Sequence, residues 1–220
     1  EVPDRVARDG HDGGVRRPSP DLLETIQLMQ RRQAWMRMFV AEEEQPLLTF
    51  VRSATPDQRV EDIAAQMRAT LGLTGGWAQQ ESTWTEALAH LRQRIEAAGV
   101  LIVINGVVGN NVHRKLSVSE FRGFALCDER TPLIFVNGSD GKAAQMFTFA
   151  HELAHLWLGQ DGVSNLPNLQ PAPIGIEQFC NAVAAEFLIP ATELAASWVA
   201  AERTDDPFQM LARRFKVSPI

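Results

Sequence analysis

The chain of 220 residues contains no tyrosine, only two cysteines and no long apolar run. Cys127 and Cys180 are too few for a disulfide framework, and Cys180 falls inside an apolar predicted helix, which indicates a buried free thiol. No apolar run reaches the roughly 18–20 residues that a membrane-spanning helix needs, and the charged N-terminus has no signal-peptide core. These absences favour a cytoplasmic protein with no membrane partner.

Positive charge is also scarce, because 27 acidic side chains outnumber 21 Lys and Arg and leave a formal net charge of −6. That balance argues against a broad nucleic-acid-binding surface, so we expect contact with nucleic acid only through regions outside this chain. The sequence starts at Glu1 without methionine, which suggests a piece of a longer protein or a processed one. Its length allows one good-sized core, or a core with a small helical annex.

Composition and periodicity divide the chain into four segments. Residues 1–20 are rich in Gly, Pro, Asp and Arg without periodicity, which predicts a linker or arm, and residues 21–75 predict an N-terminal helical segment. Residues 76–190 predict the main core, and 191–220 predict C-terminal helices whose last stretch resembles the opening of a truncated helix-turn-helix. Outside the motif described next, helices are expected at 21–41, 56–71, 83–98, 191–202 and 207–216.

The most informative motif is His-Glu-Leu-Ala-His at residues 151–155. His151 and His155 project from the same face of a predicted helix, where two imidazoles can bind one metal ion, and Glu152 flanks that metal as a general base. The alternative is a buried helix whose two histidines have ordinary hydrogen-bond partners and bind no metal. Apolar neighbours predict that this helix lies in the core, where each unpaired polar group would cost roughly 1–3 kcal/mol, and one metal ion would satisfy all three.

A catalytic zinc ion normally has three protein ligands and one open position. Asp161 lies six residues after His155, where some zinc proteases carry their third ligand. That arrangement needs a glycine three residues after the second histidine, but this chain has Leu158 there and Gly159 one position later. Asp161 is therefore the weaker of two candidates.

Glu177 is the stronger candidate for the third ligand. It follows a stretch of glycines, prolines and asparagines that predicts a loop, and it opens a second apolar helix that stops at Pro190. Asn181 lies one turn further on the same face, where its amide could orient a metal ligand. The alternative explanation of Glu177 is an exposed acid that the helix dipole favours at a helix start.

The two helical segments together, FTFAHELAHLWLG at 147–159 and EQFCNAVAAEFLIP at 177–190, resemble the ImmA/IrrE family of zinc metallopeptidases. Residues 120–126 and 132–137 also match that family's pattern, and the resemblance covers roughly residues 80–190 closely. The resemblance implies a gluzincin-like HExxH peptidase in a zincin-like fold. It also implies cleavage of a helix-turn-helix repressor, which releases genes of a mobile element, toxin–antitoxin pair or stress response.

For the individual residues, the resemblance implies His151, His155 and Glu177 as metal ligands and Glu152 as general base. The fold class that follows is α+β, with a small three-stranded sheet beside the metal-binding helix and helices on both sides in sequence. β-Branched residues predict the three strands at 100–104, 121–127 and 133–136. An edge strand of that sheet could pair with an extended substrate backbone.

Because the chain has no tyrosine, no residue is an obvious second donor to the oxyanion. Zinc proteases commonly use tyrosine or histidine as a second donor to the oxyanion, and here His113, between two predicted strands, is the candidate. An ordinary surface loop is the simpler explanation of His113. We therefore expect a slow, selective or partner-activated protease rather than a general one.

Two other functions are compatible with part of this evidence. A zinc-stabilised module could bind a repressor without cutting it, and it would tolerate Gln at position 152, whereas a protease needs the carboxylate of Glu152. A DNA-binding regulator is a weaker alternative, since its contacts would have to come from outside this chain. Zinc is the expected metal, and manganese is the second candidate because histidine–carboxylate sites accept several first-row metals.

Overall fold

The computed structural model describes residues 18–160 and 174–219. Within these residues the fold is α+β, with seven α-helices, one 3-10 helix and two small sheets. The helices are α1 (Pro20–Glu42), α2 (Val60–Thr70), η1 (Trp77–Gln80), α3 (Trp84–Ala97), α4 (Lys142–Leu158), α5 (Ile174–Leu188), α6 (Ala191–Ala201) and α7 (Pro207–Phe215). The strands are β1 (Leu101–Asn105), β2 (Val107–Val108), β3 (Asn111–Lys115), β4 (Gly123–Leu126) and β5 (Leu133–Asn137).

The main sheet has the order β1-β5-β4, so β5 is its central strand. β1 runs parallel to β5, whereas β4 runs antiparallel to it, with Phe124 opposite Phe135. Side chains of β5 alternate between the two faces: Phe135 packs with α1, and Ile134 packs with the helices of the other face. Both faces of β5 are therefore buried, which explains its nearly continuous apolar sequence.

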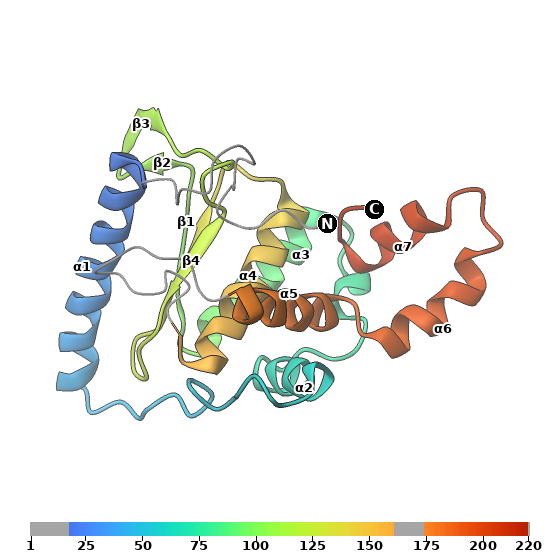
Figure 1. The fold of residues 1–220 in the computed structure, drawn as a ribbon, viewed down its shortest axis with the longest axis horizontal. Coiled ribbons are helices and arrows are strands. Elements are labelled where there is room, and N and C mark those ends of the chain that lie inside the picture. The colour runs from blue at the N-terminus through green and yellow to red at the C-terminus, as the bar shows by residue number, and fades with distance from the viewer. Residues whose placement is uncertain (1–17, 161–173, 220) are drawn as a thin grey trace.

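One face of the sheet is covered by α1 and the other by α3 and α4 (Figure 1). α5 packs between α4 and α2, and Arg68 of α2 donates a hydrogen bond to the carbonyl oxygen of Glu186 near the end of α5 at 2.8 Å. α6 and α7 form a small cluster of their own around Ala201, Leu211 and Phe215. The largest core thus lies around α4, the helix that carries the histidine motif.

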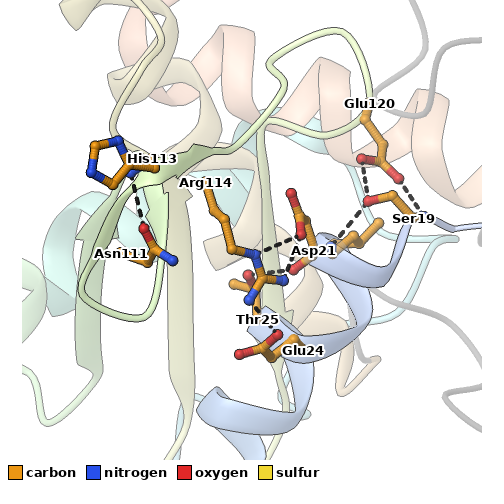
Figure 2. A network of polar contacts seen from close by, with 9 residues as sticks. Ser19, Asp21, Glu24, Thr25, Asn111, His113, Arg114 and Glu120 are labelled. Carbon is orange, nitrogen blue, oxygen red and sulfur yellow. Dashed lines mark hydrogen bonds and ion pairs between the residues drawn. The ribbon is translucent and has the colours of Figure 1, made fainter.

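Polar contacts fasten α1 to the sheet near both of its ends. At its start, Arg114 of β3 forms ion pairs with Asp21 at 2.6 Å and Glu24 at 2.8 Å (Figure 2). Toward its end, the Gln33 amide donates hydrogen bonds to two backbone carbonyl oxygens, and Arg37 pairs with Asp128 at 2.6 Å. The segment preceding the predicted core is thus attached directly to the sheet.

The sequence predicted the fold class and the order of these elements. The three strands of the main sheet and the helices lie where expected, except that α2 starts at Val60 rather than Pro56 and β4 is shorter than the predicted 121–127. The two-stranded sheet of β2 and β3 was not predicted, and His113 lies within β3 rather than between strands. Among the described residues, no single helix is long and apolar enough to cross a membrane, and α5 with α6 passes that test only as a pair bent by 55°.

Candidate metal centre

The histidine motif lies in the second half of α4, at the centre of the largest core. His151 and His155 are each 1% exposed and Glu152 is 2% exposed, because apolar neighbours on α4 pack against both the sheet and α5. Gly159 ends the helix with φ of 68°, a left-handed conformation that glycine adopts without strain. The sequence prediction of a buried helix is confirmed.

Glu177 of α5 meets both histidines. Its carboxylate oxygens lie 3.2 Å from Nε2 of His151 and 3.3 Å from Nε2 of His155, and the two Nε2 atoms are 2.9 Å apart. Among the described residues, these three form the group of side chains whose ligand atoms lie close enough together to hold a metal ion, all within 4.8 Å of one another. A tetrahedral site with bonds of 2.0–2.1 Å has ligands about 3.3 Å apart, so this donor set fits a zinc ion.

The packing of α5 on α4 explains why Glu177 reaches the histidines. Cys180 and Ala184 are fully buried on the face that Glu177 shares, and such small side chains allow the two helices to approach closely. Glu177 itself lies in the first turn of α5, and its side chain is 20% exposed. The carboxylate is thus the part of the group that is closest to solvent.

The electrostatics of His151, His155 and Glu177 stabilise a positive charge placed between them. Burial opposes ionisation of Glu177, but hydrogen bonds from His151 and His155 outweigh it and hold the pKa of the carboxyl well below its ordinary value of 4.5. Burial likewise lowers the pKa of His155, but the Cys180 sulfur and the Glu177 carboxylate outweigh it and raise that pKa from 6.5 to about 10. A proton can supply this charge, and a divalent cation with the same ligands would supply it too.

Asn181 holds the other side of the His151 ring. Its Oδ1 atom lies 2.9 Å from Nδ1 of His151, and because an amide oxygen only accepts, Nδ1 must carry the hydrogen. In the neutral ring the lone pair of Nε2 then points toward Glu177 and His155, whereas in the protonated ring Nε2 donates a hydrogen bond to Glu177. The structure therefore brings together the four residues that the sequence singled out as ligands and as a supporting amide.

Glu152 lies beside the start of strand β4. A side chain at Gly123 would collide with Thr148 of α4, would come 2.7 Å from the carbonyl oxygen of Phe135, and would lie 3.7 Å from Oε1 of Glu152. Gly123 therefore allows the edge strand to approach α4 at the level of Glu152. The sequence analysis did not single out Gly123, although a glycine at the start of a strand signals such a close approach.

His113 lies elsewhere, exposed on β3. Its backbone N–H donates to the Asn111 side chain at 3.0 Å, and Figure 2 shows its imidazole pointing away from the ion pairs of Arg114. Among the described contacts, none joins His113 to the metal-binding group, and its catalytic role stays a prediction. Asp161, the alternative third ligand, lies outside the described residues.

Cys180 is a residue near the centre whose position the sequence only partly revealed. It is a free, fully buried thiol, as predicted, but it also contacts the imidazole of His155. Its spacing of three residues from Glu177 was the available signal, because residues at i and i+3 of a helix share a face.

A model of a known protein family matches this chain. The family model described as IrrE N-terminal-like domain, Peptidase_M78, matches residues 95–220, which is more than half of the chain and includes α4 and α5. No curated protein matches the chain.

Proposed function

Because this chain belongs to the Peptidase_M78 family of IrrE N-terminal-like domains, we propose that it is a zinc-dependent, site-specific endopeptidase. The family match confirms the resemblance to ImmA/IrrE proteins. It indicates a metallopeptidase-type function with a protein as substrate. The observation that carries the proposal is the convergence of His151, His155 and Glu177 in a buried group that also adjoins a second glutamate, Glu152.

In this proposal, His151, His155 and Glu177 hold the metal, and Asn181 keeps the His151 ring oriented. A bound zinc ion would supply a Lewis acid toward the scissile carbonyl. Two imidazoles with one carboxylate favour zinc, and manganese remains the second candidate. The protein's contribution is a set of three converging ligands in a largely buried site.

Glu152 is proposed as the general base. It follows His151 directly on the same helix, and its negative charge helps to raise the pKa of His155, which indicates that its carboxylate lies close to the ligand group. A carboxylate in this position can take a proton from the attacking water and return it to the leaving amine. Proton transfer of this kind typically accelerates a reaction by about 10²–10⁴-fold.

Strand β4 is the proposed docking edge for the substrate. It is one of the two edge strands of the main sheet, and its first residue, Gly123, lies against α4 near Glu152. The backbone groups of an edge strand can pair with an extended peptide, which supplies affinity with little demand on sequence. An extended peptide added beside β4 would run past the proposed general base.

A helix-turn-helix repressor or antitoxin-like regulator is the proposed substrate. The support is the family itself, together with a chain that lacks the tyrosine that many general zinc proteases use as a second oxyanion donor. Cleavage of such a regulator would release the genes that it represses.

The test is an incubation with zinc and the helix-turn-helix repressor encoded beside this protein, followed by intact-mass measurement. We expect a discrete cut by the parent protein, and a rate at least about 10²-fold lower for Glu152→Gln, which keeps the shape of the side chain but removes the base. Glu202→Gln, at the exposed C-terminal end of α6, is the matched control and should cut like the parent.

A repressor that stays whole but co-elutes with both the parent and Glu152→Gln would instead favour the non-cleaving interaction module. Cleavage by Glu152→Gln at the parental rate would contradict the role of Glu152 as base.

A further inference from the structure

The second half of α1 exposes large apolar side chains to solvent. Trp35 is 69% exposed, Met38 is 68% exposed and Phe39 is 46% exposed. The rings of Trp35 and Phe39 stack with their centroids 6.3 Å apart, so part of this apolar surface has a fixed shape. An exposed apolar patch of this kind is typical of a surface that another molecule covers.

The helical period shows which residues of α1 face away from the sheet. Ile26 and Met29 pack on the sheet, and α1 runs along one margin of the molecule, at the left in Figure 1. Four exposed residues, spaced by four, three and four positions, lie on the opposite side of the helix and are here called the outer stripe: Arg31, Trp35, Met38 and Glu42.

The spacing of the outer stripe is that of a helix that packs against another helix. Intervals of three and four residues keep side chains in one seam, as at the a and d positions of a coiled coil. The outer stripe follows this pattern over three turns of α1, with its two apolar residues in the middle and a charged residue at each end.

The charges of the outer stripe favour one direction for a second helix. The stripe begins with a cation, Arg31, and ends with an anion, Glu42. A second copy of α1 lying antiparallel would place Arg31 of each copy opposite Glu42 of the other, and Trp35 of each copy opposite Met38 of the other. Both pairs have the same midpoint along the helix, so one two-fold axis forms them all. A parallel copy would instead place equal charges opposite each other.

We propose that the outer stripe of α1 is a self-association surface, through which two copies of this chain form an antiparallel, two-fold dimer. The contact covers little more than one helix face, so the dimer should be weak, with a dissociation constant in the micromolar range. The metal-binding helix α4 lies on the other face of the sheet, so association should not depend on bound metal.

Sedimentation equilibrium of the full chain tests the proposal. Between about 5 and 500 μM, the mass should rise from the monomer value of 24.4 kDa toward twice that value, with or without zinc. Trp35→Ala should weaken the dimer by at least about 100-fold, because each copy contributes this ring to the centre of the contact. Trp198→Ala, which removes an exposed tryptophan from α6, is the matched control and should associate like the parent.

Two charge reversals test the arrangement of the copies. Arg31→Glu and Glu42→Arg should each weaken self-association by about tenfold, because the two-fold axis turns two attractive pairs into two repulsive ones. An equimolar mixture of these two variants should form a mixed dimer with the parental affinity, since opposite charges again meet at both ends. Arg203→Glu, an exposed reversal between α6 and α7, is the control and should associate like the parent.

Three results would overturn the proposal. The first is a mass that stays at the monomer value up to about 500 μM, which would leave the outer stripe for a different partner. The second is a dimer that Trp35→Ala does not weaken, which would place the interface elsewhere. The third is a mixture of the charge variants that associates no better than either variant alone. Because every substituted residue is exposed, circular dichroism should show the parental fold for each variant.

Discussion

The two faces of the main sheet carry helices with opposite arrangements of polar groups. On one face, α4 has its polar groups at the centre of the buried surface, where His151, Glu152 and His155 are at most 2% exposed. On the other face, α1 has an apolar centre, with Ile26 and Met29 packed on the sheet.

The charged contacts of α1 lie toward its ends, where Arg114 pairs with Asp21 and Glu24 and Arg37 pairs with Asp128. Its buried amide, Gln33, donates hydrogen bonds to two backbone carbonyl oxygens. Such peripheral charged contacts fasten a helix at little cost, because the charged groups stay partly hydrated. Polar groups in the middle of a buried face lose their hydration and need strong partners in return. Their presence in α4 is therefore a sign of chemistry, whereas those of α1 are a sign of attachment.

The largest expected effect concerns the charge at the centre of α4. Because the pKa of His155 is raised to about 10, a metal ion must displace a proton from this ring at any pH below that value. We expect zinc affinity to fall by about tenfold for each unit that the pH drops between 9 and 7, measured by chelator competition. An affinity that does not change over this range would contradict the raised pKa of His155.

The stability of the metal-free protein should fall as the pH rises above 6.5, whereas the zinc affinity should rise. The raised pKa of His155 contributes stability that is fully present below 6.5 and is lost as the pH rises toward 10. The lowered pKa of Glu177 contributes stability above 4.5 that is lost as the pH falls. Urea unfolding should therefore find the contribution of this pair greatest between about 4.5 and 6.5 and declining above it.

A third prediction tests how closely the sheet approaches α4. Gly123→Ala should lower the free energy of unfolding by about 2–3 kcal/mol, because the added methyl group meets Thr148 and the rigid backbone of Phe135. It should also slow cleavage, since β4 must shift beside Glu152. Gly141→Ala is the control, because a methyl group there meets nothing within 4 Å and should cost about 0.5 kcal/mol as a poorer helix cap. Equal losses in urea unfolding would show that the approach of β4 is not tight.

The smallest effect is expected on the α1 face. Gln33→Leu should lower the free energy of unfolding by about 1–2 kcal/mol, because two carbonyl oxygens, those of Leu126 and Thr131, lose their donor. Zinc affinity should stay at the parental value, since α1 attaches the sheet from the far side. Gln27→Leu, exposed on the same helix, is the control and should change stability by less than about 0.5 kcal/mol. A loss of zinc affinity in Gln33→Leu would mean that the two faces are coupled.

The metal centre was readable from sequence because its signals are local. The spacing of His151 and His155 places them on one helical face, and the loop that precedes Glu177 marks the start of a second apolar helix. The structure brings these three side chains together. The central strands were also readable, because short β-branched runs such as β5 are buried on both faces.

The hairpin of β2 and β3 could not be predicted from the sequence, because it depends on long-range contacts and has no local signal. β3 reads Asn-Val-His-Arg-Lys and is largely exposed, so it has no apolar alternation to predict a strand. Its attachment to the molecule includes Arg114, whose partners Asp21 and Glu24 lie about 90 residues earlier in the chain. The location of His113, and with it the distance of that residue from the metal centre, depends on these long-range contacts.

The sequence by itself determined the types of ligand, their spacing along two helices and the apolar strands of the sheet, because each of these depends on neighbours within one or two helical turns or one strand. The sequence offered Asn181 as support for a metal ligand, but only the tertiary structure decided that this ligand is His151. Only the tertiary structure also decided that Cys180 lies near His155 and that Gly123 brings the edge strand to Glu152. These contacts depend on how α5 crosses α4 and on which face of the sheet meets α4. Both are set by packing between segments far apart in the chain, which no local pattern records.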